Sequence, residues 1–355
     1  MLPSLLRPHA SRGRVNVRRR GTPPEQARQP VLLVRMHTVL TRSPLEAAGF
    51  IKCGGIAAFP TETVYGLGAD IFNEAAIAKI FEAKMRPADN PFIAHIGSLE
   101  QITLIAAEIP AHAQKFIEEF FPGPLTIVLP KTSAVPAAAT AGLDTIGVRM
   151  PRNVIAIEFL KACGTPVAAP SANISGRPSP TSWQAVFEDL NSRIDCILQG
   201  ETTEIGLEST VVDCSGDIPM LLRTGAVLLE MLRRIVPETR NFQPCSDEAP
   251  RSPGMKHRHY APAAKVILVD SKSEISDLNF EISDHEFKAF IGLNKPERKF
   301  GLMKFCVSID EYAATFFEFF RECDRRNIDT IYCETVDEAG VGAALMDRLR
   351  RAAAR

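Results

Sequence analysis

The sequence predicts an α/β protein built from two domains. From Ile56 to the C-terminus, short apolar runs typical of strands alternate with stretches of helical periodicity. A proline-rich stretch, residues 237–263, interrupts this alternation, and the 355-residue length suits two domains of ordinary size. The apolar content of 45% is enough for a sizeable core. The net charge of −1 gives no general electrostatic case for a nucleic-acid or membrane partner.

Residues 1–35 differ from the rest of the chain. They hold eight arginines between Arg7 and Arg35, and Glu25 is their one acidic residue. Two interpretations are open: an organellar transit peptide, which is Arg-rich and acid-poor, or a disordered basic extension ahead of a working start at Met36. We favour the extension, because the stretch has little serine and no amphipathic stripe. It is left out of the predicted fold.

The eight cysteines are scattered, with no C-x-x-C pair and no histidines placed beside them in a zinc pattern. We therefore expect reduced, mostly buried thiols and a cytoplasmic location, without a disulfide framework or a structural zinc site. No apolar run approaches the roughly 20 residues that span a bilayer, so no membrane partner is expected.

The predicted first domain, residues 36–236, begins with a short buried strand from Ile56 to Phe59 that stops at Pro60. Polar side chains follow at once, and two glycines come soon after. Two interpretations are open: a turn into a helix in which the glycines serve the turn, or the wall of a small-molecule site at a strand end.

Helices and strands then alternate to the end of this domain. Asn73 is a plausible N-cap of a helix that ends near Arg86, before Pro87. A second helix is predicted roughly over Gln101–Phe121, and Thr181 or Ser182 caps a third. The strands are predicted at Phe92–Ile96, Leu125–Leu129, Asp144–Pro151, Val167–Pro170, Ile194–Leu198, Val211–Asp213 and Leu221–Gly225. Their mutual orientation is left open.

Residues 237–263 are predicted to be a linker that closes over a site, because the cluster SPGMKHRHYAP is too basic and aromatic for a passive tether. A new alternation fills residues 264–355 and indicates a small parallel sheet. Ser308 and Glu311 form a capping box at the start of one of its helices. The strands are predicted at Lys265–Val269, Phe287–Leu293, Leu302–Val307 and Ile328–Cys333, with a last helix at Gly340–Arg351.

Cations and hydroxyl groups gather at the strand and helix ends of the first domain. No carboxylate pair, nucleophile elbow or P-loop accompanies them. Such a set fits the binding and alignment of anions, as in nucleotidyl transfer with Mg²⁺ carried by the nucleotide. Arg149 is the strongest member, because it lies within an apolar strand and needs a partner there. The members are Lys84, Arg86, Arg149, Arg223, Thr61, Thr63, Thr145, Ser171, Asn173, Ser209 and His95.

The motifs that hold these residues resemble those of the YrdC-like threonylcarbamoyl-AMP synthases in their longer, two-domain form. They occur in the family's order and cover about residues 40–263, and the C-terminal GVGAALMDRLRRAAAR matches more weakly. The motifs are FPTETVYGLGAD (59–70), KMRPADNPF (84–92), PGPLTIVLP (122–130), GVRMP (147–151), APSANISGRPSPTS (169–182), GLESTVVD (206–213), LLRTGAV (221–227) and SPGMKHRHYAP (252–262).

The resemblance implies an enzyme that combines L-threonine, bicarbonate and ATP into L-threonylcarbamoyladenylate and releases pyrophosphate. The product would pass to a separate tRNA threonylcarbamoyl transferase complex that modifies adenosine 37. The first domain would be a twisted mixed sheet with a basic cavity, and the second a small Rossmann-like parallel α/β domain without a nucleotide of its own. No tightly bound cofactor is implied, and weak RNA binding is an expectation of the fold.

Carried over by motif, one set of residues would hold the threonine: Thr63, His95, Arg149, Ser171 and Ser209. A second set would hold ATP: Lys84, Arg86, Asn90, Thr145, Asn173, Thr181, Arg223 and Tyr260. Thr61 is the alternative to Thr63, and His259 is a further candidate beside Tyr260. The sequence does not identify a general base. We expect His95 to position the substrate rather than to accept a proton.

Two other functions are kept open. One is a maturation enzyme that forms carbamoyl-adenylate from carbamoyl phosphate, although its upstream zinc-finger module would need C-x-x-C pairs that this chain lacks. The other is a non-enzymatic module that binds double-stranded RNA, against which the near-zero net charge counts.

Overall fold

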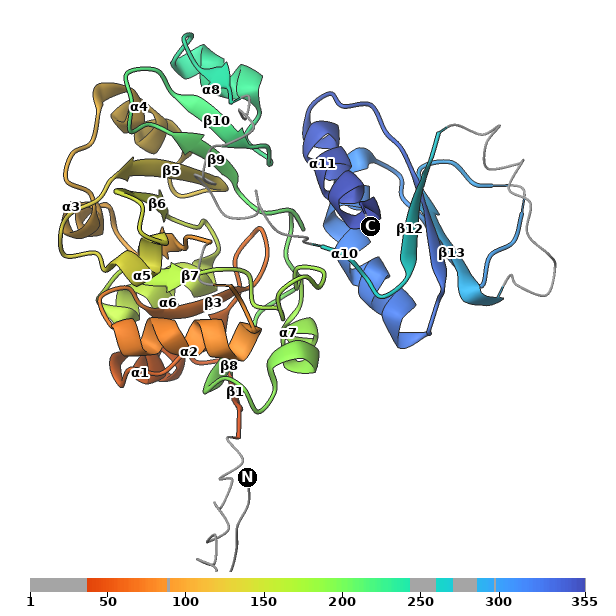
Figure 1. The fold of residues 1–355 in the computed structure, drawn as a ribbon, viewed down its shortest axis with the longest axis horizontal. Coiled ribbons are helices and arrows are strands. Elements are labelled where there is room, and N and C mark those ends of the chain that lie inside the picture. Colours follow the sequence, from red (N-terminus) through yellow and green to blue (C-terminus); the bar gives the residue numbers. More distant parts are fainter. Residues whose placement is uncertain (1–36, 88–89, 243–259, 271–285, 297, 355) are drawn as a thin grey trace, which may run out of the picture. The chain divides into compact units, whose positions relative to one another are not determined.

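The structure is a computed structural model that describes residues 37–87, 90–242, 260–270, 286–296 and 298–354. An 11-stranded mixed sheet organises the first domain (Figure 1). Parallel and antiparallel neighbours both occur in it: β2 runs antiparallel to β3, and β4 runs parallel to β6. In sheet order the strands are β1 (Val39–Thr41), β8 (Cys196–Leu198), β2 (Ala57–Phe59), β3 (Gly66–Asp70), β7 (Val167–Ala169), β4 (Ile93–His95), β6 (Thr145–Arg149), β5 (Leu125–Pro130), β9 (Thr210–Asp213), β10 (Met220–Arg223) and β11 (Arg240–Asn241).

Side chains of β2 alternate between two apolar clusters, one on each face of the sheet. Ala58 belongs to the main core, whereas Ala57 and Phe59 pack in a second cluster with helices α1 (Pro44–Lys52) and α6 (Val154–Cys163). Successive strand residues point to opposite faces. Therefore α1 and α6 cover one face at this end of the sheet, and the main core covers the other.

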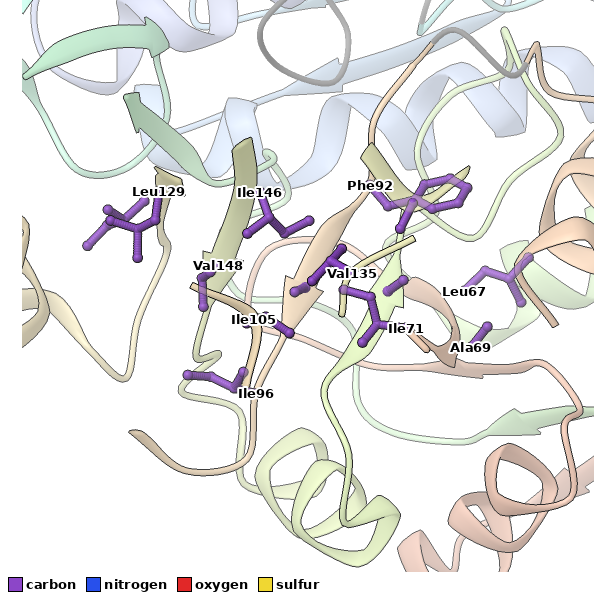
Figure 2. Close-up of a cluster of buried hydrophobic side chains, with 14 of the residues drawn as sticks. Leu67, Ala69, Ile71, Phe92, Ile96, Ile105, Leu129, Val135, Ile146 and Val148 are labelled. Carbon is purple, nitrogen blue, oxygen red and sulfur yellow. The ribbon is translucent and has the colours of Figure 1, made fainter. Parts of the chain in front are cut away.

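The main core extends along the sheet beyond β2. Figure 2 shows Leu67 and Ala69 of β3 in the same buried cluster as Ile146 and Val148 of β6. The remaining helices of this domain are α2 (Glu74–Lys84), η1 (Leu99–Gln101), α3 (Ile102–Ile105), α4 (Ala111–Phe120), α5 (Ala137–Thr140), α7 (Trp183–Leu190) and α8 (Leu229–Ile235).

Polar side chains occupy the face opposite the main core over the middle of the sheet. On β6, Ile146 and Val148 point into the core, so Thr145 and Arg149 point to the other face. His95 of β4 lies directly beside Arg149 in the parallel register of the two strands. We call this polar surface over the neighbouring strands β4, β6, β5 and β9 the open face.

The predicted helix over Gln101–Phe121 is wrong as a single element. The chain forms η1 and α3, leaves the helix at Ala106, and starts again as α4 after Pro110. Two features account for the break: proline lacks an N–H and disfavours a helical residue before it, and Ala106 pairs with Lys131 in an isolated bridge.

The two glycines after the first strand do not serve a turn into a helix. They lie in β3, antiparallel to β2, with Gly66 opposite Phe59 and Gly68 opposite Ala57. A Cβ atom on Gly68 would lie 2.6 Å from a Val167 methyl carbon, so the close packing of β2, β3 and β7 requires glycine there. The helix that follows begins at the predicted cap, because the Asn73 side chain accepts a hydrogen bond from the N–H of Ala76.

Four parallel strands form the second sheet, which confirms the predicted parallel arrangement. Ser308 caps the first of the helices described in this domain and accepts from the N–H of Glu311, as predicted. In sheet order the strands are β12 (Lys265–Val269), β15 (Thr330–Glu334), β13 (Lys288–Gly292) and β14 (Leu302–Phe305), and the helices are α10 (Ile309–Arg325) and α11 (Val341–Ala353).

Strand β11 lies in the range predicted as linker and pairs with β10. The basic cluster of that range lies outside the described residues, apart from Tyr260 and the residues after it. Within the described part of the chain, no helix is both long and apolar enough to cross a membrane. The described cysteines are free thiols, and all but Cys53 are buried.

Candidate functional site

A pocket opens on the open face and extends to Tyr260, near the end of the range predicted as linker. Every residue predicted for threonine lines it, as do four of those predicted for ATP. The lining residues are Thr63, Val64, Tyr65, Gly66, Arg86, Ile93, His95, Arg149, Ala169, Pro170, Ser171, Asn173, Arg177, Ser179, Glu208, Ser209, Arg223 and Tyr260.

Arg149 is buried in the pocket wall and has the partner that its position in an apolar strand demanded. Its Nη2 donates to Oε1 of Glu62 over 2.7 Å, and its Nη1 donates to the Thr63 hydroxyl over 2.7 Å. Its Nε donates to the carbonyl of Gly123 over 3.3 Å. A guanidinium has five N–H donors, so these contacts leave two for a ligand in the pocket.

The two candidate threonines have different positions. Thr63 lines the pocket, whereas Thr61 is not among the lining residues. The Thr61 hydroxyl donates to the carbonyl of Val64 over 2.7 Å and lies 2.8 Å from the Thr63 hydroxyl. Thr61 therefore orients Thr63 from behind, and Thr63 is the one that can reach a ligand.

His95 contributes a neutral imidazole to the pocket. Burial, aided by the positive charge of Arg149, lowers the pKa of His95 to about 3. Its Nδ1 lies 3.2 Å from the carbonyl oxygen of Ile93, and its ring packs edge-on against Phe59. A group with so low a pKa is a poor base at neutral pH, which favours a positional role.

The Ser209 hydroxyl contacts both Thr126 of β5 and Arg223 of β10. That hydroxyl lies 2.7 Å from the Thr126 hydroxyl and accepts from Nη2 of Arg223 over 3.1 Å. The Nε of Arg223 also donates to the backbone carbonyl of Ser209. The guanidinium is thus fixed beside Ser209, in a position to receive an anionic group.

Lys84 supports the pocket without lining it. The ammonium group is fully buried and donates to the backbone carbonyls of Ser171 and Asn173. Burial, together with the charge of Arg86, holds the pKa of Lys84 well below its usual value. This lysine fixes the loop on which Ser171 and Asn173 enter the pocket.

The other residues predicted for ATP lie around the pocket rather than in its wall. Thr145 lines a smaller adjoining hollow on the open face, which shares Ile93 with the pocket. Asn90 and Thr181 are buried, and the Asn90 Oδ1 and Thr181 Oγ1 atoms have no hydrogen-bond partner among the described residues. His259 lies outside the described residues.

Tyr260 reaches the pocket from the end of the predicted linker. Its backbone φ of 70° is in the left-handed region, which a tyrosine adopts at a cost of roughly 1–3 kcal/mol. The ring is buried against Phe317 of α10, and burial raises the pKa of Tyr260 to about 12. The next residue, Ala261, donates its N–H to the carbonyl of Gly176. Tyr260 is thereby held between the loop of residues 170–182, here called the SAN loop, and the second domain.

Sequence reasoning missed several polar residues of the site. Glu62 holds Arg149, Arg177 and Ser179 line the pocket, and Glu208 lines it beside Ser209. Glu62 lies in the motif FPTETVYGLGAD and Glu208 in GLESTVVD. Each is a single carboxylate, and the two are far apart in the chain, so they do not form a recognisable pair in the sequence. An arginine within an apolar strand indicates that an acidic partner is needed. The neighbouring sequence does not show which Asp or Glu residue is that partner.

The two carboxylates in or behind the pocket wall are already paired with arginines. Glu62 is paired with Arg149, and Glu208 is paired with Arg348. The described residues contain no group of three or more His, Cys, Asp or Glu side chains arranged to hold a metal ion. The charge of the pocket wall is instead dominated by arginine.

Two family models match the chain. One, described as telomere recombination and covering Sua5, YciO and YrdC proteins, matches residues 49–225. The second, described as the C-terminal domain of threonylcarbamoyl-AMP synthase, matches residues 227–354.

Named relatives match over nearly their whole length. Threonylcarbamoyl-AMP synthase of Pyrococcus abyssi is 45% identical over 318 residues, which cover 86% of this chain and 92% of the relative. The Bacillus subtilis protein of the same name is 40% identical over 320 residues, covering 87% of this chain and 92% of the relative. Among solved structures, P. abyssi Sua5 complexed with L-threonine matches with a TM-score of 0.83 and 43% identity, covering 89% of this chain and 97% of that one.

Proposed function

Because the chain belongs to the Sua5/YrdC family of threonylcarbamoyl-AMP synthases, we propose that the pocket on its open face is where threonine and ATP meet. The chain is an enzyme of this class: it makes L-threonylcarbamoyladenylate, and this is the first step in forming N6-threonylcarbamoyladenosine in tRNA. The observation that carries the assignment of the site is the meeting of arginines and hydroxyls in one pocket.

The threonine end of the pocket centres on Arg149. A guanidinium with two unused donors suits the amino acid's carboxylate. The hydroxyls of Thr63 and Ser209 suit the ammonium and hydroxyl groups of threonine, because a hydroxyl both donates and accepts. The neutral ring of His95 contributes to the shape of the pocket and does not add a positive charge beside the ammonium group of threonine. Ser171 completes the group on the side of the SAN loop.

The ATP end of the pocket centres on Arg86 and Arg223. Arginines bind phosphate oxygens through paired N–H donors, and Asn173 and Tyr260 lie in the same wall. Thr145 in the adjoining hollow extends this region over β6. In our proposal Lys84, Asn90 and Thr181 serve ATP from behind the wall, and His259 remains a candidate beside Tyr260.

Mg²⁺ enters this proposal with the nucleotide. The carboxylates at the pocket already neutralise arginines, so a metal would be held by the phosphates of ATP. Bound there, Mg²⁺ would offset charge on the triphosphate. The protein's own contribution is to place the threonine nitrogen, the bicarbonate-derived carbon and the α-phosphate together, and to stabilise the charge that develops during transfer.

The other expectations from the resemblance belong to the same proposal. They are a cytoplasmic location, transfer of the product to a separate tRNA threonylcarbamoyl transferase complex, and weak RNA binding.

The test is a pyrophosphate-release assay with the full chain. The protein is incubated with ATP, Mg²⁺ and radiolabelled bicarbonate, with L-threonine, with L-serine, or with no amino acid. The proposal predicts pyrophosphate release and a labelled nucleotide with L-threonine, and neither without an amino acid. Threonine and serine differ by one methyl group, for which a pocket contributes about 1–3 kcal/mol, so we expect serine to react roughly 10-fold or more slowly.

Equal release without an amino acid would contradict the proposal. Release that depends on carbamoyl phosphate would indicate a carbamoyl-adenylate former. Salt-dependent binding of double-stranded RNA without any turnover would indicate a binding module.

A further inference from the structure

The segment that carries Ser209 into the pocket is packed against the second domain. Gly206 has a backbone φ of 71°, and a Cβ atom there would lie 2.5 Å from the Cα of Ala314 in α10. Leu207 is fully buried in the apolar cluster of the second domain, which also contains Phe316. The backbone of this segment is therefore held by α10, at a point where only glycine permits the close approach.

Helix α11 contacts the next residue of the segment through a buried arginine. Arg348 has no exposed surface, and its Nε donates to Oε2 of Glu208 over 3.1 Å. The other oxygen of Glu208 accepts from the Ser179 hydroxyl over 2.6 Å. The Arg348 guanidinium also lies 5.9 Å from the centre of the Tyr260 ring and donates to Asp347.

A buried arginine is costly unless its charge is used. The Nη2 atom of Arg348, with its two N–H groups, is buried and has no hydrogen-bond partner among the described residues. Within its own helix Arg348 contacts Ala344 and Asp347, and its contacts beyond the helix are with Glu208 and Tyr260, which both line the pocket. The position of Arg348 is therefore explained by the pocket better than by the core of its own domain.

Glu208 lies between two arginines. Burial alone would raise the pKa of Glu208, but the charges of Arg348 and Arg223 and the Ser179 hydrogen bond hold it below its usual value. The carboxylate is thus ionised at neutral pH. If Arg348 were absent, the charge of Glu208 would be balanced chiefly by Arg223, the residue fixed beside Ser209.

We propose that Arg348 is a positioning residue: it neutralises and holds Glu208, so that the charge of Arg223 is directed to the phosphates of ATP. This inference rests on the proposed function, because it takes Arg223 as a phosphate ligand. It gives the second domain a defined part in the reaction, which is to supply the counter-charge for a carboxylate in the pocket wall.

The test compares KM values for ATP and for L-threonine in Arg348 variants of the full chain. Arg348→Met removes the charge, and Arg348→Gln removes it while keeping a donor for Glu208. In both we expect the KM for ATP to rise at least tenfold, with the KM for threonine changed less than threefold. Arg348→Lys keeps the charge and should stay within threefold of the wild type for both substrates.

Two further variants separate this role from plain stability. Glu208→Gln combined with Arg348→Met removes both charges and should bring the KM for ATP back to within threefold of the wild type. Arg350→Met is the matched control on the same helix, because Arg350 pairs with Glu338 at the surface. It should change neither KM.

Several outcomes would overturn the inference. One is a folded neutral variant with an unchanged KM for ATP, and another is a raised KM that the double variant does not relieve. If both neutral variants fail to fold, Arg348 serves stability and the inference is wrong. Failure of the proposed function would look different, because the wild type itself would then show no threonine-dependent release of pyrophosphate.

Discussion

The two sheets of the molecule differ in what binds the hydrogen-bond donors at their strand ends. In the parallel sheet, the carboxyl ends of β13 and β15 meet, which is where α/β proteins commonly bind anionic ligands. Here the chain's own Glu334 occupies that place. It accepts from the backbone N–H groups of Leu293 and Asn294 over 2.7 and 2.8 Å, and also from the Asn294 amide. A Cβ atom on Gly292 would collide with the same carboxylate.

On the open face of the mixed sheet, by contrast, donor side chains line a pocket. The acids of this face, Glu62 and Glu208, are each paired with an arginine, and hydroxyl and arginine side chains line the pocket. Donors at a strand end can therefore serve a ligand where the chain's own anions leave some of them unused, as at Arg149. Glu334 takes up the donors of the parallel sheet, whereas the buried Arg149 of the mixed sheet keeps two donors for a substrate.

The largest expected effect comes from Arg149→Met on the open face. The change leaves Glu62 buried without its cation, which typically costs about 3–5 kcal/mol of stability. It also removes the proposed carboxylate ligand, so threonine-dependent turnover should fall at least 100-fold. Denaturant unfolding and the pyrophosphate assay measure the two effects.

A double variant separates stability from activity at this site. Adding Glu62→Gln to Arg149→Met removes the unpaired charge and should restore most of the stability, but not the turnover. If turnover returned with stability, Arg149 would be a structural residue and the open face would lose its main substrate ligand.

A smaller effect is expected from Glu334→Ala in the parallel sheet. The variant leaves the N–H groups of Leu293 and Asn294 without their acceptor, at a cost of about 1–3 kcal/mol. Both KM values should stay within twofold of the wild type, since this edge holds no substrate. A raised KM for ATP with unchanged stability would show that the parallel sheet takes part in nucleotide binding.

The smallest effect concerns His95 and pH. The pKa of His95 is lowered in the folded protein to about 3, whereas the unfolded chain binds a proton near pH 6.5. The folded state is therefore penalised progressively as the pH falls below 6.5, by about 1.4 kcal/mol per unit. Between pH 6.5 and 5.5 we expect His95 to account for a loss of about 1 kcal/mol in unfolding free energy.

His95→Asn is the variant that tests this dependence. Urea unfolding of the wild type and the variant across that range should show a shallower pH slope in the variant. Parallel slopes would mean that His95 is protonated in the folded protein, and its neutral role in the pocket would be wrong.

Local signals allowed much of the fold and site to be predicted from sequence. Asn73 and Ser308 have cap chemistry within four residues, and both are caps in the structure. Arg149 was predicted to need a partner because it lies in an apolar strand, and Glu62 with Thr63 supplies it. The motifs placed the five threonine candidates, and the structure brings all five to one pocket.

Features that depend on distant parts of the chain could not be predicted. The strand β3 has no β-branched pattern, and its glycines are explained only by the packing of Phe59 and Val167. Strand order joins segments far apart in the sequence, such as β1 with β8. Glu208 and Arg348 are 140 residues apart, and neither residue's local sequence indicates the other.

Calorimetric titration of ATP in the presence of L-threonine tests the contrast between the two sheets most directly. We expect the wild type to bind one equivalent of ATP, and Arg223→Gln to weaken the affinity roughly 10- to 150-fold, because a lost charge-assisted contact costs about 1.5–3 kcal/mol. Glu334→Ala should bind ATP as the wild type does. Binding that is insensitive to Arg223→Gln, or that is lost in Glu334→Ala, would contradict the account.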